Sequence, residues 1–351
     1  MEINWRVNRR PFSKEICREV ENIVRKLQKG DKIGIFTPSS PASTTAKLRY
    51  ERGKAFLEAK GFQIVEGSLT SQSEGYRSGT PKARGEELNE LLRDPTIKMI
   101  MSMIGGTNSN SILPYIDYEA FRKNPKPVVG YSDATAILLA LYAKTGIPTY
   151  YGPALVPSFG EFEPLVHETY RFFEDYFCGN PKLPYEIPMS AFWSDEPVNW
   201  LEKTQEKPLY SNNWLGFNEG TAEGRLIGGN NNAMYGFIGT EYFPSIHEGD
   251  ILLIEDSMKN ASIVEKNFAM LKLHGVFEKV AAIILGKHEC FDDLGTGKQP
   301  IDLLLEQLDG RNIPILAEFD TCHTHPMHPI AIGKNVKIDT KLKKVWCIEE
   351  W

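Results

Sequence analysis

The sequence predicts a two-domain α/β protein whose first domain is built on a doubly wound, mostly parallel sheet. In the first half of the chain, short apolar runs alternate with stretches of helical periodicity, which is the pattern of βαβ units. In the second half, apolar strand-like runs recur with few helical stretches between them. The length of 351 residues is long for one core and suits two domains.

Each element of the first domain is expected from its own signal. Lys32 to Phe36 is a short apolar strand that leads into a small-residue loop at 37–41 and then a helix at 46–60. Further apolar runs predict strands at 62–65, 97–104 and 128–129, and periodic leucines predict helices at 84–92 and 134–141. Ligands of such sheets usually sit in the loops at the carboxyl ends of the strands.

The second domain is expected to be β-rich. Apolar runs predict strands at 225–227, 251–254, 280–285, 313–316, 330–332 and 345–348, with a helix at 263–273. Residues 155–222 mix proline, aromatic and acidic residues without sustained periodicity, which favours a linker with surface insertions.

The N-terminal segment 1–30 reads as an appended arm. Ser13 can cap an amphipathic helix with apolar residues at 16, 20, 23, 24 and 27 that ends near Gly30. The expected organisation is therefore an arm at 1–30, a first domain at 31–180, a linker with an aromatic insert at 181–222 and a second domain at 223–351.

Composition excludes several classes of protein. The formal net charge of -6 argues against a nucleic acid polymer or an anionic membrane as the main partner. The five cysteines are scattered without a Cys-x-x-Cys pair, which suits a reducing compartment and offers no zinc framework. The N-terminus lacks an apolar signal core and no run of 18 apolar residues occurs, so we expect a cytoplasmic protein.

Residues 127–135, Pro-Val-Val-Gly-Tyr-Ser-Asp-Ala-Thr, place Ser132 between a buried strand and a helix. A serine on such a turn is held out of the sheet, with the positive end of the helix dipole behind it. The arrangement is similar to a nucleophile elbow, although Ala134 stands where the usual pattern has its second glycine. A Ser-Asp pair that opens a helix is also a common N-cap, and the turn alone does not decide between the two.

A second loop, Gly105-Gly106-Thr107-Asn108-Ser109, directly follows the third expected strand. Paired glycines allow a ligand to approach the backbone and leave N–H groups free to donate. We expect Gly106 N–H and Asp133 N–H to form an oxyanion hole. The alternatives are a plain tight turn or a nucleotide phosphate loop, and the absence of Gly-x-Gly-x-x-Gly and Gly-Lys-Ser/Thr patterns disfavours the phosphate loop.

The second domain concentrates its chemistry at Glu255 and in the segment 320–329. Glu255 is a carboxylate at the exit of a buried strand, and three of the seven histidines, His323, His325 and His328, fall within six residues. The histidines could bind a metal, Cys322 could be a nucleophile, or one histidine could be the base for Ser132 with Glu255 at its other ring nitrogen. Only the last arrangement supplies every part of a catalytic mechanism: a nucleophile, a base and an acid that orients the base.

The insert region carries Trp193, Trp200 and Trp214 in a loop-like stretch. Exposed aromatic side chains there could stack on a flat substrate group, or they could fix the loop to the body. Asn230, after Gly228-Gly229, could contact a polar group of the substrate or could cap a turn.

The chain resembles the LD-carboxypeptidase family of serine peptidases, and in particular its microcin C self-immunity branch, from about residue 32 onward. The resemblance rests on ordered matches at 37–41, Gly79-Thr80-Pro81 with Arg84 and Leu88-Asn89, Gly105-Gly106, 130–135, 228–230, 253–256 and 323–327. Two departures occur: Ile104 stands where the family often has arginine before the paired glycines, and Cys322 where a glycine commonly precedes the catalytic histidine.

The resemblance implies a fold, a site and a reaction. The fold would be a flavodoxin- or Rossmann-like parallel sheet domain with a smaller C-terminal, β-rich, swivelling-type α/β domain. The nucleophile would be Ser132, the acid Glu255 and the base His323, with Gly105, Asn230, Trp193 and Trp200 near the substrate. The enzyme would need no metal or organic cofactor and would act as a homodimer on an amide bond near a free carboxyl terminus.

The resemblance leaves two substrate classes. One is an aminoacyl or peptidyl nucleotide antibiotic of the microcin C type, which the aromatic insert favours. The other is the L,D-bond of a muropeptide in cell-wall recycling. A metallohydrolase that uses His323, His325 and His328, or a non-catalytic binding protein, would be the alternatives of another class.

Overall fold

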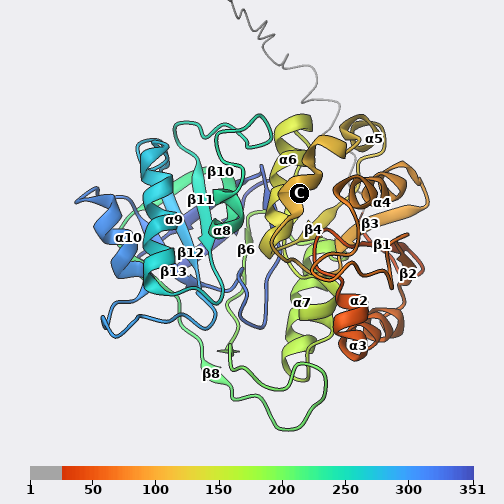
Figure 1. The fold of residues 1–351 in the computed structure, drawn as a ribbon. Coiled ribbons are helices and arrows are strands. Elements are labelled where there is room, and N and C mark those ends of the chain that lie inside the picture. Colours follow the sequence, from red (N-terminus) through yellow and green to blue (C-terminus); the bar gives the residue numbers. More distant parts are fainter. Residues whose placement is uncertain (1–25) are drawn as a thin grey trace, which may run out of the picture.

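The computed structural model describes residues 26–351, which form two β-sheets lying side by side with helices on their outer faces (Figure 1). The first sheet has six strands in the order β14-β5-β4-β3-β1-β2. Its members are β1 (Lys32–Phe36), β2 (Gln63–Glu66), β3 (Ile97–Ser102), β4 (Val128–Gly130), β5 (Thr149–Tyr151) and β14 (Ile330–Ile332). Strands β1 to β5 are parallel, and β14 pairs with β5 in the antiparallel direction.

The helices of the first half follow the expected alternation. They are α2 (Ala42–Thr45), α3 (Lys47–Ala59), α4 (Pro81–Arg93), α5 (Tyr118–Lys123), α6 (Thr135–Thr145) and α7 (Leu165–Phe177), with the short helical turns η1 (Ser109–Tyr115), η2 (Ser132–Ala134) and η3 (Leu155–Phe159). Local signals set their ends: the Thr80 side chain caps α4 with Pro81 at the first position, and Gly146 ends α6 with a φ of 76°.

The second sheet has eight strands in the order β6-β16-β15-β10-β11-β12-β13-β9. They are β6 (Tyr185–Glu186), β9 (Leu215–Phe217), β10 (Thr221–Asn230), β11 (Ile251–Glu255), β12 (Ala282–Gly286), β13 (Ile315–Phe319), β15 (Asn335–Asp339) and β16 (Lys344–Cys347). The central strands β10 to β13 are parallel, and β11 and β12 are almost wholly apolar, as expected for strands buried on both faces. The remaining helices are α8 (Asn231–Tyr235), α9 (Ala261–Leu273) and α10 (Pro300–Leu308), and α9 and α10 cover the outer face of this sheet (Figure 1).

Two expectations about the middle and end of the chain are wrong. Residues 155–222 contain the helix α7, whose buried face includes Phe172, Phe173 and Tyr176. Aromatic residues are common in strands, so the sequence of this segment does not look helical. In the structure these residues line the buried face of α7. The same region also supplies β6 and β9, which form the two edges of the second sheet, and a hairpin of β7 (Phe192–Trp193) and β8 (Tyr210–Ser211).

The strand at 330–332 was expected in the second domain, but β14 extends the first sheet. A short apolar run identifies a buried strand without saying which sheet it joins. The predicted arm helix lies mainly within residues 1–25, outside the described residues. Across residues 26–351, no helix is both long and apolar enough to cross a membrane.

The two sheets meet along α6, which contacts β10, α8 and β14 (Figure 1). This junction brings together the carboxyl end of β4 from the first sheet and the carboxyl ends of β10 and β11 from the second. Ser132 follows β4, Glu255 is the last residue of β11 and His323 follows β13, so the expected Ser-Glu-His set lies at the carboxyl ends of strands from both sheets.

Candidate active site

Ser132 lies on the turn between β4 and α6. Its backbone φ is 60°, a left-handed conformation that a serine rarely adopts and that is typical of a nucleophile elbow. The Thr135 side chain donates to the Ser132 carbonyl oxygen at 2.6 Å, which holds the turn. A side chain at Gly105 would place its Cβ 2.8 Å from Ser132 Oγ, so the glycine keeps the space in front of the hydroxyl open.

The backbone N–H groups of Gly106 and Asp133 flank this space. Among the hydrogen bonds of residues 26–351, neither N–H donates to a protein atom. The Asp133 carboxylate faces away and accepts from Ser109 N and Ser109 Oγ at 2.8 and 2.7 Å, which fixes the neighbouring turn. Two unsatisfied donors next to a serine hydroxyl can receive the negative oxygen of a tetrahedral intermediate.

Glu255 and His323 are in direct contact. Glu255 is the last residue of β11 and its side chain is fully buried, and its Oε2 lies 2.6 Å from His323 Nδ1. Because Nδ1 carries the proton donated to Glu255, Nε2 is the nitrogen left to accept a proton from a serine.

The environment favours the ionised pair. Burial opposes ionisation of Glu255, but the charge of His323 and the hydrogen bonds from its partners outweigh burial and lower the pKa of Glu255. Burial acts against the imidazolium as well, but the charge of Glu255 and its hydrogen bond outweigh it and raise the pKa of His323. The site can therefore stabilise an imidazolium, as proton abstraction by a histidine requires.

Tyr151 connects the two halves of the site, and no pattern in the sequence pointed to it. Its hydroxyl donates to Glu255 Oε1 at 2.5 Å and accepts from the Ser132 backbone N–H at 3.2 Å. A line of hydrogen bonds thus runs from the Ser132 backbone through Tyr151 and Glu255 to His323. The edge of the Tyr131 ring packs against His323 with ring centroids 4.8 Å apart, which also fixes the imidazole.

The side chain of Asn230 is held by hydrogen bonds within the protein, and its predicted contact with the substrate stays a prediction. Its Nδ2 donates to Glu255 Oε1 at 2.9 Å, and its Oδ1 accepts from Ala233 N to cap α8. Both ends of the amide are therefore engaged, as the turn-capping alternative expected. With Gly106 and Asp133, Asn230 also lines a small cavity of about 60 Å³.

The three tryptophans of the insert have three different environments. Trp214 is buried against Phe319 and donates to Asp320, so it belongs to the core. Trp193 packs on Tyr210 at the rim of a pocket, and the Trp200 ring, 40% exposed, stacks on the Arg49 guanidinium at 3.7 Å. Only Trp193 and Trp200 keep an accessible ring.

The insert loop is tied to the body by a buried charged group that we call the Glu161 cluster, made of Arg49, Glu161, Lys207 and His325. Glu161 Oε2 lies 3.0 Å from Arg49 Nη2 and 3.3 Å from Lys207 Nζ. Burial lowers the pKa of His325 to about 3, so this ring is neutral beside Glu161 at 3.8 Å. The backbones of Ser194 and His325 also pair through two hydrogen bonds, so the insert contacts the chain two residues after His323.

The histidines do not support the metal alternative. His325 faces Glu161, whereas His328 is buried with Nδ1 2.6 Å from the Pro329 carbonyl oxygen. Within residues 26–351, no group of three His, Cys, Asp or Glu side chains is arranged to hold a metal ion. Burial raises the pKa of Cys322 to about 12, which leaves its thiol protonated and removes it as a nucleophile.

Comparisons with known proteins agree with the resemblance. Residues 33–152 match the LD-carboxypeptidase N-terminal domain and residues 223–338 match the LD-carboxypeptidase C-terminal domain. The microcin C7 self-immunity protein MccF of Escherichia coli is 50% identical over 93% of this chain and 95% of its own length. A Vibrio cholerae protein named as a carboxypeptidase, VC_A0337, is 53% identical over 90% of this chain and 94% of its own length.

A solved structure of MccF without ligand superimposes with a TM-score of 0.92 at 49% identity, covering 94% of this chain and 99% of that one. A second, in complex with aspartyl sulfamoyl adenosine, gives 0.91 at 50% identity and covers 93% and 98%. The match confirms the predicted fold class of two α/β domains with parallel strands. The chain therefore belongs to the LD-carboxypeptidase family of serine peptidases, in the branch of the microcin C7 self-immunity protein.

Proposed function

We propose that this serine peptidase hydrolyses the amide bond that joins an aminoacyl or peptidyl group to a modified nucleotide, with Ser132 as nucleophile, His323 as base and Glu255 as the orienting acid. The observation that carries the catalytic assignment is the line of hydrogen bonds from Ser132 through Tyr151 and Glu255 to His323. It links into one site three residues of which the outer two, Ser132 and His323, lie 191 positions apart in the sequence (323 minus 132).

The proposed reaction proceeds through an acyl-enzyme. His323 Nε2 takes the Ser132 proton as Oγ attacks the amide carbonyl, and Glu255 stabilises the imidazolium. The N–H groups of Gly106 and Asp133 hold the oxyanion until the carbon–nitrogen bond breaks and His323 returns its proton to the leaving nitrogen. Water, deprotonated by His323, then cleaves the ester, releasing the carboxylic acid and restoring the Ser132 hydroxyl.

Two features support a nucleotide leaving group. The chain is 50% identical to the microcin C7 self-immunity protein, whose solved structures hold aspartyl sulfamoyl adenosine and glutamyl sulfamoyl guanosine. Trp200 offers an exposed indole backed by Arg49, and such a ring can stack on a base.

Muropeptide L,D-carboxypeptidase activity is the second candidate, because a Bacillus subtilis relative named as a murein peptide carboxypeptidase is 27% identical.

We further infer a cytoplasmic homodimer with a first domain at 31–180 and a second at 223–351, from which β14 (Ile330–Ile332) returns to the sheet of the first domain. The four cysteines among the described residues, Cys178, Cys290, Cys322 and Cys347, are all unpaired, which is compatible with a reducing compartment. Sedimentation equilibrium would test the dimer.

The decisive experiment compares the wild type with Ser132→Ala on aspartyl sulfamoyl adenosine and on an L,D-tetrapeptide. We expect the wild type to release aspartate, and the variant to lose about 10⁴-fold or more in kcat. Ser245→Ala, at an exposed position, is the matched control and should keep wild-type rates. Hydrolysis that persists in Ser132→Ala would refute the triad, and cleavage of the tetrapeptide alone would select the second candidate.

A further inference from the structure

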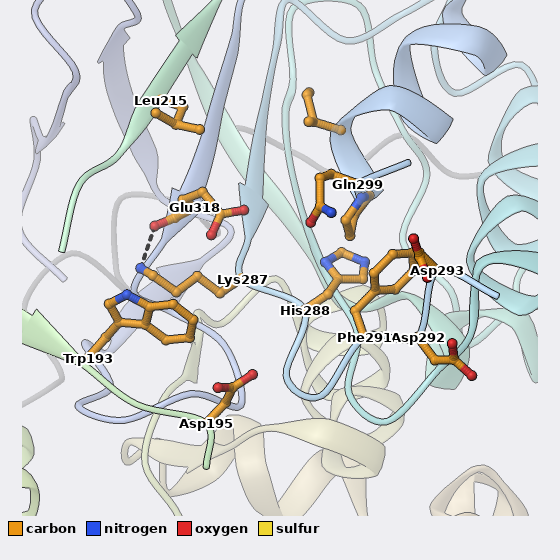
Figure 2. A pocket seen from close by; sticks show the side chains of 12 residues that line it. Trp193, Asp195, Leu215, Lys287, His288, Phe291, Asp292, Asp293, Gln299 and Glu318 are labelled. Carbon is orange, nitrogen blue, oxygen red and sulfur yellow. Dashed lines mark hydrogen bonds between the residues drawn. The ribbon is translucent and has the colours of Figure 1, made fainter. Parts of the chain in front are cut away.

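A pocket of about 630 Å³ lies at the carboxyl ends of β12 and β13, and Ser132, Glu255 and His323 are not among the residues that line it. Figure 2 shows its walls: Lys287 and His288 after β12, Phe291 on the next loop, Glu318 of β13, and Trp193 from the insert. The start of α10 closes one side with Gln299.

This pocket adjoins the proposed catalytic site. Lys287 and His288 directly follow Gly286, and a side chain at Gly286 would place its Cβ 2.8 Å from Glu255 Cβ and 3.0 Å from Cys322 Cβ. The end of β12 is therefore packed against the catalytic carboxylate and the segment that carries His323.

The pocket has an excess of negative charge. Four carboxylates line it, those of Asp195, Asp292, Asp293 and Glu318. Its single ammonium, on Lys287, is already bound to Asp320 Oδ1 at 2.5 Å. The same ammonium donates to the Glu318 carbonyl oxygen at 2.6 Å (Figure 2). A cationic ligand would compensate this charge, whereas an anionic one would be repelled.

Glu318 and His288 each present an acceptor without a partner. No hydrogen bond among the described residues reaches the Glu318 carboxylate, and its backbone φ of 62° turns the residue out of the regular strand. Burial raises the pKa of this carboxyl group, which a bound cation would reverse.

His288 is fixed in one tautomer. Its Nδ1 lies 3.1 Å from the Gly286 carbonyl oxygen, which can only accept, so Nδ1 carries the proton and Nε2 presents a lone pair. The Nε2 atom is buried and has no partner among the described residues, and burial lowers the pKa of the ring to about 4, which keeps it neutral. A ligand that donates several N–H bonds would satisfy both His288 and Glu318.

The aromatic rings favour the same ligand. The Trp193 ring already lies 5.5 Å from the Lys287 ammonium, and Phe291 adds a second apolar surface to the pocket. Indole and phenyl faces attract organic cations, and guanidinium most of all because it is planar and weakly hydrated.

We propose that this pocket is a subsite for an organic cation, a guanidinium or primary ammonium group, carried by the acyl part of the substrate beyond the aminoacyl group at the scissile bond. The inference rests on the proposed function, because it assigns the pocket to the same substrate. The nucleotide part does not fit here, since its anionic linkage would face four carboxylates.

The test compares two dipeptidyl sulfamoyl adenosines, arginyl-aspartyl and citrullinyl-aspartyl, which have nearly the same shape and differ in charge. For the wild type we expect kcat/KM to be about tenfold higher with the arginyl substrate than with the citrullinyl one. The difference should lie in a lower KM, because a charge-assisted contact strengthens binding. Glu318→Gln should lower this ratio to about two or less. The ratio is internal to each variant, so it does not depend on the amount of folded enzyme.

Glu219→Gln is the matched control, because Glu219 is exposed, pairs with Lys341 and lies outside the pocket. It should keep the wild-type ratio. A ratio near one in the wild type, or an undiminished ratio in Glu318→Gln, would overturn the proposal.

A binding measurement separates this proposal from the proposed function. Arginine amide and citrulline amide are titrated into Ser132→Ala by calorimetry, with and without Glu318→Gln, so no hydrolysis is needed. Binding of arginine amide alone, lost with Glu318→Gln, supports the cation subsite even if no nucleotide is cleaved. Absence of arginine amide binding overturns the cation subsite. If arginine amide binds but hydrolysis shows no preference for the arginyl substrate, the pocket takes a free ligand, and the proposal that it holds part of the substrate is overturned.

Discussion

Replacement of Glu161 by glutamine tests how the insert loop is held. The Glu161 side chain is 3% exposed. It forms ion pairs with Arg49 of α3 and with Lys207 of the insert, and so it connects the two. Burial opposes its ionisation, but the cations Arg49 and Lys207, joined below about pH 3 by the protonated His325, outweigh burial and lower the pKa of Glu161 to about 2. Glutamine keeps the shape of the side chain and removes the charge.

The size of the effect follows from that pKa. A shift from 4.5 in the unfolded chain to about 2 in the folded protein contributes at most about 3 kcal/mol to the free energy of unfolding at neutral pH, where His325 is neutral and only Arg49 and Lys207 favour the charge. Because the folded pKa is the lower one, this contribution is present in full above 4.5 and is lost as the pH falls toward 2. At about pH 3.5 it should have declined to about 2 kcal/mol.

Urea unfolding of the wild type and Glu161→Gln, followed by circular dichroism between about pH 7 and pH 3.5, measures the difference. Glu163→Gln is the control, because that carboxylate is exposed and bound only to His167 on the surface, and its unfolding midpoint should not move. A Glu161→Gln difference below about 1 kcal/mol at neutral pH, or one that does not shrink on acidification, would refute the ionised cluster.

Three further predictions concern catalysis. Glu255→Gln should lower kcat by about 10⁴-fold and move the acidic limb of the kcat/KM profile to lower pH, because the carboxylate raises the pKa of His323; an unmoved limb would contradict the pairing. Gly106→Ala places a Cβ 2.2 Å from Ser39 Oγ at a backbone φ of 147°, so the loop must shift. Its kcat should fall by about 10²-fold with an unchanged circular dichroism spectrum; a wild-type kcat would remove Gly106 from the oxyanion hole. Trp200→Leu should raise KM for aspartyl sulfamoyl adenosine by about tenfold with little change in kcat, and an equal rise for the tetrapeptide would argue against base stacking.

Local chemistry made much of the site predictable. Ser132 and Glu255 each follow a short apolar run, and the end of a buried strand is where a polar side chain signals a site. His323 was located instead by the cluster of three histidines and by the family resemblance. The same reasoning located β1, β4, β11 and β12 to within about two residues.

What joins distant segments could not be predicted. Tyr151 is one of two adjacent tyrosines, and its role depends on the position of Glu255 in the other sheet. The pairing of Glu161 with Arg49 and Lys207 depends on how the insert folds back, which no local spacing encodes. Trp200 and Trp214 look alike in the sequence, yet one is on the surface and the other in the core.

The path of the chain around His323 limits how the enzyme can open. His323 lies on the crossing from β13 in the second sheet to β14 in the first, where Ile330 pairs with Tyr151. A wide hinge motion of the two domains would stretch this crossing and pull His323 from Glu255 before a substrate could enter. We therefore expect substrate admission and release to depend on the insert hairpin, and turnover to respond to a cross-link within that hairpin more than to one across the two sheets.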